Sequence, residues 1–203
     1  MKKVIILAIS VLITGAVNAQ TFGVKGGLNF SNIIKTGDKD FNTEFKTGFN
    51  AGLFVEIPIV SSFAFAPELM FSQKGYKTSG TSLLWGANEY SVTTNFIEVP
   101  ILAKIKASDK FSIVAGPQVS FLTSTTETFK QGSESYQNTI REENDRLKKS
   151  LFGGVVGVGI DVTEKVSLNG RYALDFQKNN ENGTTETPRY KNQVYQVSLG
   201  LKF

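Results

Sequence analysis

The stretch NFIEVPILAKI, residues 95–105, decides the fold because its side chains change character at every second position. From residue 97 onward one face holds only apolar groups, namely Ile97, Val99, Ile101, Ala103 and Ile105. Both charged residues, Glu98 and Lys104, fall on the opposite face. Successive side chains of a β-strand point to opposite faces, so a period of two is typical of a strand. The stretch is therefore predicted to be a strand with one wholly apolar face.

The same alternation recurs along the chain from residue 20 onward, and no segment has the pattern of a buried helix. Seven further stretches carry it: residues 22–30, 49–57, 63–71, 111–121, 152–162, 166–176 and 195–203. Together with the first stretch they predict an all-β fold of about eight strands.

The connections between these strands alternate between long and short. The long ones cover residues 34–47, 77–90, 123–150 and 178–194, and the short ones cover 60–62, 108–110 and 163–165. A single up-and-down antiparallel transmembrane β-barrel has this arrangement, with short periplasmic turns and long extracellular loops. Within the longest connection, two alternatives remain open. Residues 127–129 and 136–140 could add a ninth and a tenth strand, and a capping box at Thr139 could begin a short helix.

The charged residues of the predicted strands all lie on the face opposite the apolar one. They are Lys25, Glu56, Glu68, Lys74, Glu98, Lys104, Asp161, Arg171, Asp175 and Lys202. A lysine or arginine that faced lipid at the middle of a bilayer would cost about 2 to 4 kcal/mol, which explains an outer face without charges. Because five of the ten are acidic and five are basic, we expect them to line the lumen and to pair there.

A secreted soluble barrel of lipocalin type is the competing interpretation, since it also has eight strands but turns its apolar face inward around a ligand. Two features favour the membrane barrel. The polar face is rich in Gly, Ala, Ser and Asn, which suit a crowded lumen better than a solvated surface. Aromatic residues gather toward the strand ends, as in the interfacial girdles of membrane barrels.

The first 19 residues have the form of a cleaved signal peptide. Lys2 and Lys3 precede an apolar run over residues 4–13, and small residues end the segment before Gln20. The run is shorter than the 18 or so residues that a membrane-spanning helix needs. The predicted domains are therefore a signal peptide, 1–19, and an outer-membrane barrel, 20–203. Loss of two lysines lowers the formal charge from +4 to +2, which gives no reason to expect nucleic acid as a partner.

The chain contains no His and no Cys. This composition excludes Ser-His-Asp triads, thiol nucleophiles, disulfides and His- or Cys-ligated metals. Small membrane-barrel enzymes that use histidine are excluded on the same ground. We expect no catalytic residue, no cofactor and no metal.

Three segments resemble a known family. The closing strand, residues 195–203, ends in Phe203 and resembles the C-terminal signal of bacterial outer-membrane barrels. Residues 95–104 resemble the "hydrophobic-Glu-x-Pro-hydrophobic-x-x-Lys" strand of the Bacteroidota PorT-like, porin-family outer-membrane β-barrel proteins. Residues 67–75 and 170–172 resemble two further strands of that family. The resemblance implies a Gram-negative outer-membrane location and recognition of the strand ending at Phe203 by the barrel assembly machinery.

The function predicted from these features is that of a monomeric barrel with a structural or binding role and a lumen filled by side chains. Outer-membrane lipid is its expected surrounding. A small-solute or ion channel is the alternative, although such a pore commonly displays a ring of one charge sign. A secretion-system accessory or an adhesin, acting on a protein partner through loop 123–150, is a further alternative.

Overall fold

The computed structural model describes residues 20–35, 43–82, 86–131, 134–141, 148–179 and 189–203. The predicted signal peptide, 1–19, lies outside these ranges. The strands are β1 (Thr21–Lys35), β2 (Glu44–Val60), β3 (Phe63–Ser82), β4 (Gly86–Lys106), β5 (Phe111–Gln131), β6 (Glu134–Arg141), β7 (Ser150–Asp161), β8 (Val166–Asp175) and β9 (Tyr190–Lys202). Among the described residues, no helix is long and apolar enough to cross a membrane.

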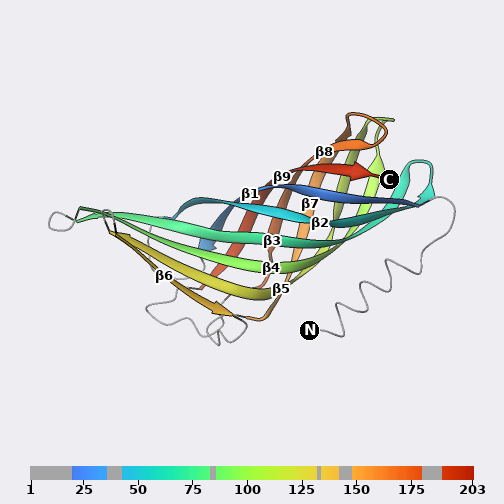
Figure 1. The fold of residues 1–203 in the computed structure, drawn as a ribbon. Coiled ribbons are helices and arrows are strands. Elements are labelled where there is room, and N and C mark those ends of the chain that lie inside the picture. The colour runs from blue at the N-terminus through green and yellow to red at the C-terminus, as the bar shows by residue number, and fades with distance from the viewer. Residues whose placement is uncertain (1–19, 36–42, 83–85, 132–133, 142–147, 180–188) are drawn as a thin grey trace.

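Eight of the strands close into a ring (Figure 1). Their order is β4-β3-β2-β1-β9-β8-β7-β5, and pairing of β4 with β5 completes the circle. Every neighbouring pair is antiparallel, including β1 with β9, so the first and last strands of the ring lie side by side. The prediction of a single up-and-down barrel with eight strands is confirmed. The three short connections, near residues 61, 109 and 164, all lie at one end of the ring, which we call the short-turn end.

The apolar face of each strand points out of the ring and the charged face points into it. In β9, Leu199 is 59% exposed, whereas its neighbour Ser198 is 3% exposed. The same contrast holds for Leu28 and Asn29 in β1. A lipocalin-type barrel requires the opposite arrangement, so that alternative is wrong.

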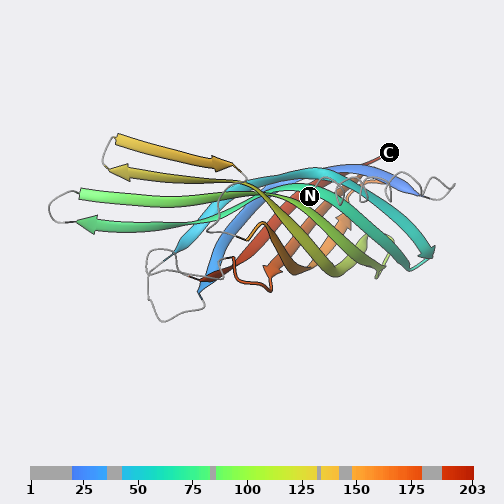
Figure 2. The ribbon, with the colours of Figure 1, turned by 90° about the horizontal axis from the view of Figure 1, so that it is seen from below.

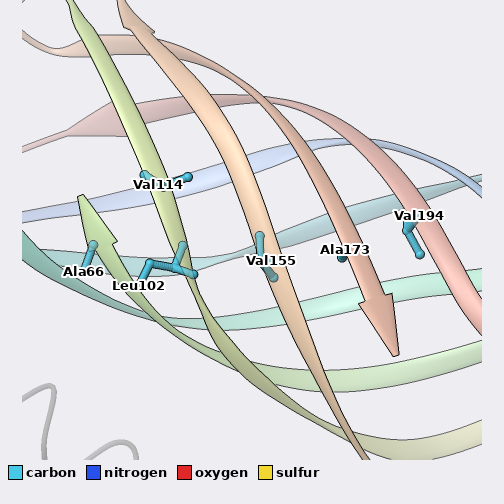
Figure 3. Packing of buried hydrophobic residues seen from close by; sticks show 6 residues of the cluster. All are labelled: Ala66, Leu102, Val114, Val155, Ala173 and Val194. Carbon is cyan, nitrogen blue, oxygen red and sulfur yellow. The ribbon is translucent and has the colours of Figure 1, made fainter. Parts of the chain in front are cut away.

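Apolar and neutral polar side chains fill the parts of the lumen that charged groups do not occupy. Figure 3 shows one buried cluster, which combines Ala66, Leu102, Val114, Val155, Ala173 and Val194 from six strands. A second joins Phe96, Leu122 and Leu151. A third, of Ile33, Tyr76, Val92 and Tyr190, lies toward the end opposite the short turns. A barrel of eight strands has an interior that side chains can fill, and the lumen of this ring is a packed core.

Three strands of the ring continue far beyond it, together with β6. Residues 75–82 of β3, 86–95 of β4 and 124–131 of β5 form, with β6, a sheet that we call the projecting sheet (Figure 2). Connections 77–90 and 123–150, predicted as long loops, are thus largely strand, and residues 139–141 belong to β6 rather than to a helix. Serine and threonine on both faces explain the error, because neither gives an apolar period, although threonine favours strands. The open question of eight or ten strands is resolved, since β6 pairs only with β5 and stays outside the ring.

Candidate functional site

The ten charged residues predicted to line the lumen form four groups inside the ring. Two are triads in the interior of the barrel, and two are pairs near the short-turn end. Each group joins residues of different strands, and in the triads these strands lie on different sides of the ring.

The first triad is centred on Glu68 of β3. Its Oε1 accepts a hydrogen bond from Nζ of Lys25 in β1 at 2.8 Å. Arg171 of β8 donates from Nη1 to Oε2 and from Nη2 to Oε1, both at 2.7 Å. A bidentate pair between a guanidinium and a carboxylate is among the strongest hydrogen-bonded ion pairs in proteins. Gly157 in β7 makes room for it, since a methyl group there would lie 2.7 Å from Cγ of Arg171.

The second triad has the reverse charge and is centred on Lys74 of β3. Its Nζ lies 2.7 Å from Oε1 of Glu98 in β4 and 3.2 Å from Oδ1 of Asp175 in β8. The same nitrogen lies 5.0 Å from the centre of the Phe96 ring, a favourable position for an ammonium.

Neutral side chains complete the second triad by donating hydrogen bonds to its carboxylates. Gln118 and Ser120 of β5 each donate to Oε1 of Glu98 at 3.1 Å. Asn192 of β9 donates to Oδ2 of Asp175 at 2.7 Å. The phase of the charges could not reveal these donors, because neutral polar residues occur on many strands. Asn192 also falls within a predicted loop, because the outward positions 191 and 193 are Lys and Gln and do not continue the apolar alternation of residues 195–203.

The two remaining pairs lie where the lumen meets the short-turn end. Lys104 donates to Glu56 at 2.6 Å, and Lys202 donates to Asp161 at 2.7 Å. Both carboxylates are more exposed than those of the triads. These pairs stand at the rim of the barrel interior.

The groups balance one another in charge. The first triad carries two cations and one anion, the second carries one cation and two anions, and each pair is neutral, so the sum is zero. A buried charge without a partner is costly, and the removal of one partner from such a pair usually destabilises a protein by about 3 to 5 kcal/mol. The arrangement therefore fills the lumen with charges that hold one another in place.

The described residues offer no arrangement for a metal ion, since no three of their Asp and Glu side chains gather in a suitable group. The carboxylates of the lumen instead accept hydrogen bonds from lysine, arginine and amide groups. The charged side chains of the lumen thus bind one another across the barrel. Among the described residues they do not form a set of ligands for a metal ion.

The family model for the outer membrane protein beta-barrel domain matches residues 18–198. The chain belongs to this family. Membership places it among outer-membrane β-barrel proteins, in agreement with the closed ring and its apolar outer wall. No curated relative matches the sequence.

Solved structures of outer-membrane proteins have a similar fold. Ail, the attachment invasion locus protein of Yersinia pestis, in complex with the heparin analogue sucrose octasulfate, is 11% identical with a TM-score of 0.52. The match covers 91% of this chain and 99% of Ail. Neisserial surface protein A is 14% identical with a TM-score of 0.50, over 90% of this chain and 97% of that protein. At these identities the likeness concerns the fold alone.

Proposed function

We propose that this family member is a non-catalytic outer-membrane barrel whose lumen is closed by its own side chains. It then acts as a membrane scaffold and binding surface rather than as a channel. The observation that carries the proposal is the pairing of all ten charged residues assigned to the lumen, six in two triads that cross it and four in two pairs at its rim. Apolar clusters occupy the space between and beyond them.

The charges do not favour the alternative of an ion channel. A selective pore commonly displays a ring of one charge sign at its narrow part. In the described lumen, Glu68 lies between Lys25 and Arg171, and Lys74 lies between Glu98 and Asp175. Opposite signs therefore occupy the same levels of the barrel.

Conductance across a planar lipid bilayer tests the proposal. The mature chain, inserted from detergent, is expected to give no discrete current steps, while a 16-stranded porin treated in the same way gives them. A Glu68→Ala, Lys74→Ala double variant, which loses the centre of both triads, is expected to give small steps. Regular steps from the wild-type chain, at a frequency that follows its concentration, would overturn the closed lumen and favour the channel.

A second candidate role, binding of a protein partner through residues 123–150, is favoured by the projecting sheet. Tyr90, Phe129 and Tyr136 lie in one cross-strand row on three of its strands, and the last two are well exposed. Exposed aromatic groups on a rigid scaffold suit protein recognition. A Phe129→Ser, Tyr136→Ser variant should fold normally and reduce attachment of cells that display the chain. Unchanged attachment would remove this role.

The processing and the family branch are also proposals. We propose that residues 1–19 are removed as a signal peptide and that the strand ending at Phe203 directs assembly of a monomer. We propose further that the chain is PorT-like and of Bacteroidota type, with the short-turn end in the periplasm. Mass spectrometry of the protein from outer membranes should find Gln20 as the first residue. An intact N-terminus in the assembled protein would contradict the cleavage.

A further inference from the structure

The outward-facing side chains of β3, β4 and β5 change from apolar to polar where these strands leave the ring. Phe71, Ile97 and Phe121 form the last apolar row across these three strands. Two residues farther along β3, Gln73 donates to Asn95 at 3.1 Å, and Asn95 donates to Ser124 at 2.8 Å. The amide row marks the place where the wall leaves the hydrocarbon, because such groups are costly in acyl chains.

Basic residues follow on the same face of the projecting sheet. Nζ of Lys77 lies 3.7 Å from Oε2 of Glu89, and Nζ of Lys130 lies 3.4 Å from Oε1 of the same carboxylate. All three side chains are at least one-third exposed. Two ammonium groups thus share a single carboxylate in contact with solvent.

A third lysine reaches this group from β2. The side chain of Lys46 passes over Gly75, where an added methyl group would lie 3.1 Å from its Cδ. Gly75 has a φ of +153°, in the region that favours glycine. Burial lowers the pKa of Lys46, and the neighbouring charges of Lys77 and Lys130 lower it further. Three cations therefore face Glu89, and Glu44 lies directly across from Lys77 in the pairing of β2 with β3. The net charge on this surface is then 3 − 2 = +1.

Two oppositely charged residues of segment 123–150 lie on different faces of the projecting sheet. Residues 123–150 carry five acidic and five basic groups. In β5, however, Lys130 lies on the outer face and Glu127 lies on the opposite one, because the two are an odd number of residues apart. The outer face is therefore basic although the segment as a whole is neutral.

We propose that Lys46, Lys77 and Lys130 bind the phosphate groups of a phosphorylated glycolipid in the outer leaflet of the membrane. Lys77 is six residues beyond Phe71, about 20 Å along the strand, and less in height because barrel strands are tilted. That height matches a sugar-phosphate headgroup directly above the acyl chains. Continuity with the apolar wall is the reason to choose a lipid over a soluble polyanion.

Binding to the full-length folded chain in detergent tests the proposal. The probes are bisphosphorylated lipid A, the same glycolipid without its phosphates, and inorganic phosphate. Lipid bound per chain is measured by native mass spectrometry over a concentration series. The phosphorylated form is expected to bind the wild type about fivefold more tightly than the dephosphorylated form. The surface has a net charge of +1, and one basic charge near an anionic headgroup adds about a fivefold gain.

The variant Lys77→Gln, Lys130→Gln is expected to lose most of that preference. The matched control, Lys110→Gln, Lys165→Gln, removes two exposed lysines from the short-turn end and should keep it. Heat-modifiable gel mobility shows that both variants are folded. Equal binding of the two glycolipids, or an equal loss in both variants, would overturn the proposal. Competition by millimolar inorganic phosphate alone would assign the surface to free phosphate and would equally overturn it.

Discussion

Strand β4 contains two glutamates, Glu98 in the lumen and Glu89 in the projecting sheet, which lie in very different surroundings. Glu98 is 2% exposed and lies 2.7 Å from the ammonium of Lys74. Glu89 is 33% exposed, and its two lysines lie 3.4 and 3.7 Å away. Both glutamates lie in the same strand, and each has a lysine nearby. Their surroundings therefore differ in burial and in the distance to the lysine.

The two regions therefore use charge for different purposes. In the lumen, water is largely excluded, and a charge that loses its partner has no solvent to replace it. On the projecting sheet, water and salt screen the charges, so the same kind of pair stabilises the fold by less than about 1 kcal/mol. The charges in the lumen close the barrel, and the charges on the projecting sheet are accessible to a ligand.

Replacement of Glu68 by alanine should have the largest effect of any single change. It leaves Lys25 and Arg171 side by side in the lumen without their shared anion. We expect a loss of about 3 to 5 kcal/mol in the free energy of unfolding, measured by urea titration of the barrel in lipid vesicles. A loss below about 1 kcal/mol, as for an exposed pair, would show that water reaches the triad.

An arginine on the outer wall should lower the free energy of unfolding nearly as much as Glu68→Ala does, for a different reason. Leu199→Arg places a cation against acyl chains, at about 2 to 4 kcal/mol near the middle of the bilayer. Phe129→Arg on the projecting sheet is the matched control, since Phe129 is also an exposed apolar residue. Its cost should stay near 1 kcal/mol or below. Similar costs for the two variants in vesicles would mean that Leu199 does not face lipid.

Replacement of Lys25 by methionine should have an intermediate effect. Glu68 keeps both hydrogen bonds from Arg171, so only one charged hydrogen bond is lost. We expect a loss of roughly 1 to 3 kcal/mol, and the Lys25→Met, Glu68→Gln double variant should lose less than the sum of the single changes. Simple additivity in this double-mutant cycle would show that the two side chains do not interact.

The smallest effect is expected for Glu89→Ala in the projecting sheet. Its two ion pairs are long and exposed, so the change in unfolding free energy should be less than about 1 kcal/mol. Raising the salt concentration to 1 M should remove even this difference, because it shortens the screening length to about 3 Å. A larger or salt-independent loss would place Glu89 in a much drier setting than its exposure indicates.

The sequence predicts those parts of the molecule where one face meets lipid. The alternation over residues 97–105 and 195–203 places both faces correctly, because a charge on the outer wall would be costly and the outward positions of these strands are apolar. The partners within the lumen could not be predicted in the same way. Lys25, Glu68 and Arg171 come from β1, β3 and β8, and only the closed ring brings these strands across from one another.

The projecting sheet could be predicted only in part. Residues 127–129 and 136–140, considered as possible extra strands, lie in β5 and β6, but the rest of the sheet shows no apolar period because it does not face acyl chains. Residues 75–82 and 124–131 are rich in serine, threonine and glycine, and their apolar residues follow no period of two. A shift in register between Asn95 and Phe96 also reverses the phase of β5 relative to β4. Pairing of each strand with its neighbours, rather than a pattern within one strand, defines this region.

The orientation of the outer wall is tested most directly by spin labels along β9. The chain contains no cysteine, so single cysteines at positions 195–201 can be labelled one at a time in barrels reconstituted in vesicles. Collision of the label with oxygen, which concentrates in the hydrocarbon, should be frequent at 195, 197, 199 and 201 and rare at 196, 198 and 200. The reverse alternation, or equal values at all seven positions, would contradict a barrel with its charges enclosed and its apolar face in lipid.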